Sequence, residues 1–229
     1  MRIRDHDKDY QVKDYSMKRA GGEIVLKWKY SRGSHFFVLL YDGRKEVDLQ
    51  KLAQEMEDKG LDDRTLLQKG GHHIYTTSDE KAKLFLFRER EFVQNGESCT
   101  IPGGEIKHAI PYGVSVFIGE YDKEEWTMHL YQVKDPEINT KFVPVKLEPK
   151  IEYKNKLFAK EKLCVLHVPY LQDYMDGALQ YHVDGVRMTY PLPASCLDKN
   201  LYIEIPKDAS VVLRVADQYK KYYRVEAAQ

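Results

Sequence analysis

The chain has 229 residues with 36 basic and 36 acidic side chains, so its formal net charge is zero. This balance argues against a dedicated nucleic-acid-binding protein, which usually carries a clear basic excess. Apolar residues make up 42% of the chain, which is enough to build a hydrophobic core and argues against intrinsic disorder.

The N-terminus and the cysteines indicate a compartment. Residues 1–9 are charged where a signal peptide needs an apolar segment, and no stretch approaches the roughly 18 apolar residues of a membrane-spanning helix. Cys99, Cys164 and Cys196 are widely spaced and odd in number, which is typical of free thiols in a reducing compartment. A disulfide between Cys164 and Cys196 is the alternative. We therefore expect a cytoplasmic protein with no membrane contact.

The first half of the chain has the pattern of β-strands. Residues 1–20 are polar and lack periodicity, which predicts an N-terminal arm that is either flexible or an irregular lead-in strand. Ile24, Leu26 and Trp28 then alternate with polar residues, which predicts a half-buried strand. Residues 35–41 form a continuous apolar run, rich in aromatic residues and too short for a typical helix, so we expect a central strand.

One segment breaks this β pattern, because its apolar residues recur at helical spacing. They are Leu49, Leu52, Ala53 and Met56. Asp48 is a suitable N-cap, and Val47 and Leu52 are placed to pack on each other as a hydrophobic staple. The pattern predicts a helix near residues 49–59.

The rest of the chain reads as further strands separated by turns. Residues 94–104 read as a loop, and the alternating segments 112–118 and 126–130 flank an acidic turn, which predicts a hairpin. A segment rich in proline then marks a linker, and short alternating strands follow it. The predicted organisation is an arm at 1–20, a β-sandwich domain at 21–135 that includes the helix, a linker at 136–145 and a second β-sandwich domain at 146–229.

The strand that bears Trp28 and the strand Tyr112-x-Val114-x-Val116 carry a resemblance to a known family. They are similar to strands B and F of fibronectin type III or immunoglobulin-like domains. The resemblance implies a mainly β chain of two tandem antiparallel β-sandwiches, with the helix as an insertion. Such domains mostly serve binding and scaffold roles, although a fold by itself does not define a function.

The sequence contains no recognisable catalytic motif. His72 and His73 are adjacent, and an exposed pair is expected rather than a metal site, since neighbouring strand residues point to opposite faces. The same argument separates Cys164 from His167, so a core thiol is favoured over a nucleophile and base. The acidic loop 58–63 lacks the order of ligands in a calcium-binding loop. We expect no catalytic residue, no metal site and no cofactor.

The 17 tyrosines are the most suggestive feature of the composition, because tyrosine is enriched at protein interfaces. Structural roles in strands are the alternative explanation. The candidate interaction surface comprises Tyr170, Tyr174, Tyr181, Tyr219, Tyr222 and Tyr223. Our leading hypothesis is a non-enzymatic interaction or scaffold protein that binds a protein partner or itself, through a strand edge or a tyrosine-rich face. The alternatives are a carbohydrate-associated module that binds a glycan, and an enzyme with a site at the domain junction.

Overall fold

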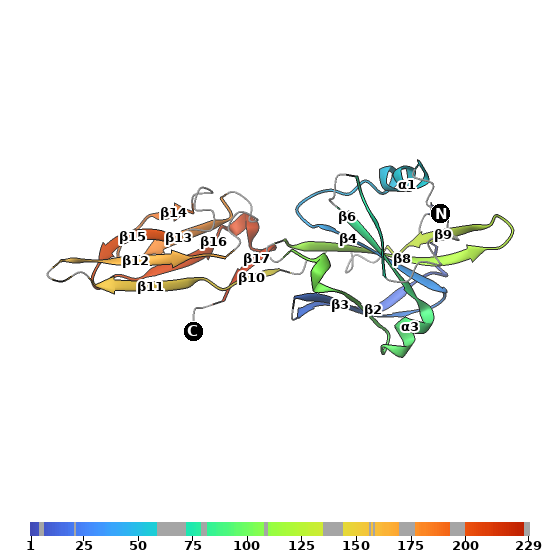
Figure 1. Cartoon of the computed structure of the whole chain (residues 1–229), viewed down its shortest axis with the longest axis horizontal. Coiled ribbons are helices and arrows are strands. Elements are labelled where there is room, and N and C mark those ends of the chain that lie inside the picture. The colour runs from blue at the N-terminus through green and yellow to red at the C-terminus, as the bar shows by residue number, and fades with distance from the viewer. Residues whose placement is uncertain are drawn as a thin grey trace. The chain divides into compact units, whose positions relative to one another are not determined.

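The computed structural model describes residues 1–4, 7–20, 22–58, 72–78, 82–107, 110–134, 144–155, 157, 159–169, 177–192 and 200–226. The chain is mainly β, as the sequence predicted, and it divides into two compact units (Figure 1). The first unit comprises residues 1–107 and 112–143, and the second comprises 108–111 and 144–229. The change of unit at 143/144 falls inside the predicted linker. No helix in the described part of the chain is long and apolar enough to span a membrane.

A six-stranded sheet forms the centre of the first unit, in the order β1-β9-β8-β4-β6-β5. Its strands are β1 (Arg2–Arg4), β4 (His35–Asp42), β5 (His73–Thr76), β6 (Ala82–Arg88), β8 (Tyr112–Asp122) and β9 (Thr127–Gln132). The neighbours pair antiparallel, except that β1 runs parallel to β9. The predicted central strand at 35–41 is β4, which pairs with β6 on one side and β8 on the other.

A smaller sheet packs on one face of the six-stranded sheet. It has the order β2-β3-β7 and consists of β2 (Val12–Ala20), β3 (Glu23–Tyr30) and β7 (Ser98–Ile101). Ile24, Leu26 and Trp28 of β3 are 0–2% exposed, which confirms the predicted buried face of this strand. The Trp28 ring lies 5.6 Å from Phe36 of β4 and 4.6 Å from Phe92 of the short helix α3 (Glu89–Gln94).

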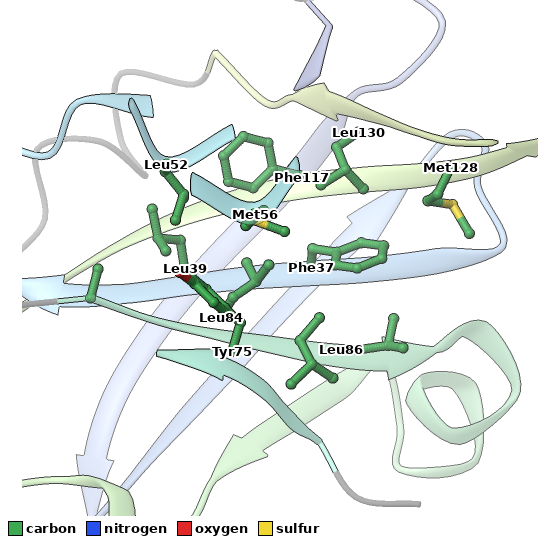
Figure 2. Close-up of a cluster of buried hydrophobic side chains, with 12 residues drawn as sticks. Phe37, Leu39, Leu52, Met56, Tyr75, Leu84, Leu86, Phe117, Met128 and Leu130 are labelled. Atoms are coloured by element: carbon green, nitrogen blue, oxygen red, sulfur yellow. The ribbon is translucent and has the colours of Figure 1, made fainter. Parts of the chain in front are cut away.

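Helix α1 (Leu49–Asp58) packs against the six-stranded sheet, as Figure 2 shows. Its buried residues Leu52 and Met56 belong to the same core cluster as Phe37 and Leu39 of β4. Phe36 and Phe37 are neighbours in the strand and point to opposite faces, so the sheet is covered on both sides. The predicted helix is therefore confirmed, with its apolar stripe against the sheet.

The start of α1 is capped as the sequence predicts. The Asp48 carboxylate accepts hydrogen bonds from the backbone N–H groups of Gln50 and Lys51, at 3.0 and 3.1 Å. We expect Asp48→Ala to lower the free energy of unfolding of the first unit by about 1 kcal/mol in urea denaturation. The control is Gln50→Ala, an exposed change in the same helical turn. An equal loss in both variants would contradict the cap as the cause.

The described residues of the second unit form two three-stranded sheets and one strand pair. The first sheet has the order β11-β12-β15, with β11 (Lys150–Asn155), β12 (Glu161–His167) and β15 (Leu201–Pro206). The second has the order β14-β13-β16, with β13 (Leu179–Val183), β14 (Thr189–Pro191) and β16 (Val211–Val215). The pair consists of β10 (Val145–Leu147) and β17 (Tyr223–Val225), which run parallel.

Both sheets of the second unit contribute to the same core clusters. Cys164 of β12 and Val211 of β16 are buried in one cluster, and Leu166 of β12 and Leu213 of β16 in another. The Val211 N–H also donates a hydrogen bond of 2.9 Å to the Tyr153 hydroxyl of β11, which ties the two sheets together.

Of the two alternatives for residues 1–20, the irregular lead-in strand is confirmed and the flexible arm is wrong, because β1 and β2 pair with β9 and β3. A shift in register between Lys13 and Ser16 interrupts β2, which explains why its sequence shows no periodicity. Two other local predictions were wrong. The expected loop at 94–104 contains β7, a four-residue strand between glycine-containing turns. Trp126 does not extend β9, since it lies in the turn with φ +54° and is 77% exposed.

Candidate functional site

The outer edge of β16 presents backbone groups that its own sheet does not use. The Ala216 N–H donates to the Ala178 carbonyl, and the Asp184 N–H donates to the Ser210 carbonyl, both at 2.9 Å. Residues of an antiparallel pair alternate between facing the partner strand and facing away. The peptide groups of Leu213 and Val215 therefore point away from β13, and the order of the sheet ends at β16.

Leu213 and Val215 line a hollow. Leu213 is 4% exposed and Val215 is 9% exposed, and the described residues provide no hydrogen-bond partner for either peptide group. A buried backbone group without a partner is costly, so such groups in proteins are nearly always satisfied. An added strand would supply the missing donors and acceptors.

We call this feature the β16 hollow. It has a volume of about 900 Å³, and all of its lining belongs to the second unit. Its lining comes from the sheet β14-β13-β16, from the 3₁₀ turn η3 (Asp217–Tyr219) and from β17. The lining residues are Gln180, Thr189, Leu213, Arg214, Val215, Ala216, Asp217, Gln218, Lys220, Tyr223, Arg224 and Val225.

The charged side chains of the β16 hollow are mostly basic. Arg214 and Arg224 are exposed, and neither has an ion-pair partner among the residues that the structure describes. Lys220 Nζ lies 2.6 Å from an oxygen of Asp217, and both side chains are largely exposed. The hollow thus has three cationic groups and one carboxylate, in a chain whose overall charge is balanced.

Four of the six tyrosines of the candidate interaction surface lie within the described residues. Tyr223 is 1% exposed, so its side chain belongs to the core. Tyr181, Tyr219 and Tyr222 are partly buried and pack against the same core cluster. Tyr181 also stacks on Tyr190, with ring centroids 5.2 Å apart. Tyr170 and Tyr174 lie outside the described residues.

The tyrosine-rich segment at 219–223 borders the β16 hollow, and the two arginines that line the hollow were not among the predicted site residues. Tyr223 and Leu213 are buried, and each is followed by an exposed arginine, Arg224 or Arg214. Because side chains along a strand alternate between its two faces, a buried residue is followed by one that points outward. An arginine between two apolar residues of a strand was a signal in the sequence. The sequence could not show that Arg214 and Arg224 line the same hollow.

A group of possible metal ligands lies where the β8–β9 hairpin turns. One ligand atom each from Asp122, Glu125 and His129 falls within 4.8 Å of the others. The Glu125 carboxylate also accepts a hydrogen bond of 2.8 Å from Arg2, and the Arg4 guanidinium lies 3.3 Å from the His129 ring. Two guanidinium groups thus supply positive charge to this group, which attaches β1 to β9.

The histidine and cysteine residues noted in the sequence are separated in the structure. His72 lies 3.5 Å from Glu91, whereas His73 lies 3.5 Å from Glu105, so the pair has two different sets of neighbours. Cys164 is a free thiol with no exposed surface, as expected for a core residue. Burial raises the pKa of the Cys164 thiol, which disfavours the thiolate that a nucleophile requires. Cys196 lies outside the described residues.

Comparison with known proteins assigns no family to these features. No protein-family model matches the chain, and no curated protein matches its sequence.

Proposed function

We propose that the chain is a non-enzymatic interaction protein that binds an extended protein segment along the edge of β16. The observation that carries this proposal is the pair of peptide groups at Leu213 and Val215, two residues that line the hollow, since these groups lack a partner among the described residues. Main-chain hydrogen bonds to such an edge provide affinity, and a neighbouring pocket provides specificity. The protein is a cytoplasmic binding module built on tandem immunoglobulin-like sandwiches.

The described tyrosines of the candidate interaction surface give no support to glycan binding at that surface. A glycan platform needs aromatic faces that are open to solvent, whereas Tyr181, Tyr219 and Tyr222 pack against a core cluster and Tyr223 is buried. The buried Cys164 thiol likewise gives no support to a nucleophilic enzyme.

The test removes a single donor from the edge. Val215→Pro deletes an N–H that points away from β13, so the hydrogen bonds between β13 and β16 are kept. Random peptides of about ten residues, displayed on phage, are selected against the intact chain and then titrated by calorimetry. We expect Val215→Pro to weaken the binding of the selected peptides by about tenfold or more.

Val215→Ala is the matched control for the lost side-chain packing, because it keeps the N–H. We expect this variant to bind within about threefold of the natural chain. A second readout does not depend on how well the proline variant folds. In NMR spectra of the natural chain, the amides of Leu213 and Val215 should show the largest shifts on binding. Selection of no peptide, or shifts confined to other strands, would refute the proposal.

A further inference from the structure

The β16 hollow also indicates the chemical character of its occupant. We propose that the bound segment is acidic, with carboxylate side chains at alternate positions that pair with Arg214 and Arg224. This inference rests on the proposed function, because it assumes an extended segment at the edge of β16.

The side chains of Arg214 and Arg224 point away from the core of the second unit. Arg214 lies between Leu213 and Val215, which are buried, and Arg224 lies between Tyr223, which is buried, and Val225, which packs on the core. Because strand side chains alternate between faces, both guanidinium groups are directed away from the core. Both residues line the β16 hollow, one from β16 and one from β17.

The charges of the two arginines in the hollow are not balanced by a carboxylate of the described residues. Asp217 is the one carboxylate of the hollow among the described residues, and this group lies 2.6 Å from Lys220. Arg214 and Arg224 consequently keep their charge uncompensated by any described carboxylate. The Arg44 side chain, by contrast, donates two hydrogen bonds to Asp42.

An added strand with acidic side chains can pair with both arginines. The side chains of an extended segment project to the same face at every second position, about 7 Å apart. Guanidinium groups bind carboxylates through two parallel hydrogen bonds, which a neutral amide cannot match. An acidic residue at alternate positions therefore satisfies the arginines while the backbone of the segment pairs with β16.

The experiment uses three peptides that differ only in charge. Each has about ten residues that alternate threonine with glutamate, glutamine or lysine, and binding to the intact chain is followed by fluorescence anisotropy. We expect the glutamate peptide to bind about tenfold more tightly than the glutamine peptide, and the lysine peptide to bind least. This preference should shrink as the salt concentration rises from about 0.05 M to about 0.5 M.

Variants of the chain assign the preference to its source. Replacing both arginines, Arg214→Gln with Arg224→Gln, should reduce the preference for glutamate over glutamine to less than about threefold. The matched control is Arg187→Gln, since Arg187 is an exposed arginine of the same unit that does not line the hollow. The control should leave the preference unchanged.

The outcomes separate this inference from the proposed function. Equal binding of the glutamate and glutamine peptides, both weakened by Val215→Pro, would overturn the acidic occupant and leave the edge-binding function intact. Binding that ignores Val215→Pro would overturn the edge-binding function itself. A preference for glutamate that survives the double arginine variant, or displacement of the peptide by a single-stranded oligonucleotide at equal concentration, would also overturn the acidic occupant.

Discussion

Replacing Trp28 with alanine is expected to lower the free energy of unfolding of the first unit by about 4 kcal/mol. The Trp28 side chain is 2% exposed and lies between the two sheets, with aromatic neighbours in Tyr15, Phe36 and Phe92. Its removal leaves a large cavity in rigid surroundings, since β3 pairs with strands on both sides and cannot collapse into the space. The measurement is urea denaturation followed by far-UV circular dichroism, read on the transition of the first unit.

Trp126→Ala is the matched control, because the chain has only two tryptophans and this one is 77% exposed. We expect its loss to change stability by less than about 0.5 kcal/mol. Trp28→Phe tests the cause further. The indole N–H of Trp28 is buried without a hydrogen-bond partner in the described part of the chain, so phenylalanine gives up volume but removes an unsatisfied donor. Its cost should be about 1 kcal/mol, and a loss as large as that of the alanine variant would contradict a packing effect.

The sequence predicted Trp28 and helix α1 well because their signals are local. Alternation of Ile24, Leu26 and Trp28 depends only on the two-residue period of a strand, and the side chain of Asp48 caps a helix within the same few residues. The structure bears out both features. The resemblance to fibronectin type III or immunoglobulin-like domains stays a prediction.

Other elements could not be predicted, because contacts distant in the sequence decide them. β7 is a strand since it pairs with β3, more than 70 residues away, and its own four residues carry too little pattern to outweigh the glycines around them. β1 has three residues and depends on β9, at the other end of the unit.

The candidate site shows the same division between local and distant signals. The tyrosine-rich segment at 219–223 does border the β16 hollow, yet the alternation that buries Tyr223 turns Arg224 outward. The direction of each side chain follows from the sequence once the strand is known. The meeting of Arg214 with Arg224 at one hollow follows only from the arrangement of β16 and β17, which lie next to each other in Figure 1.

Replacing Asp42 with asparagine is expected to cost about 3 kcal/mol at neutral pH, because it leaves a charged guanidinium in a partly buried site. The Asp42 side chain is 9% exposed and that of Arg44 is 14% exposed. Nε and Nη2 of Arg44 donate to the two carboxylate oxygens at 2.7 and 2.6 Å, and the Arg44 backbone N–H donates at 3.1 Å.

The pH dependence of this loss separates charge from shape. Burial by itself would raise the pKa of the Asp42 carboxyl, but the hydrogen bonds from Arg44 outweigh it and hold the pKa below its ordinary value. A depressed pKa stabilises the fold above the ordinary value, near 4, and this stabilisation is lost as the pH falls through the lower folded value. The difference between Asp42→Asn and the natural chain should therefore be full at pH 7, and should shrink as the pH falls below the ordinary carboxyl pKa near 4. Asp217→Asn, which removes an exposed carboxylate paired with Lys220, should cause no measurable loss at any of these pH values, since solvent screens that pair. A cost of Asp42→Asn that stays constant down to the lowest pH would contradict the ion pair as its cause.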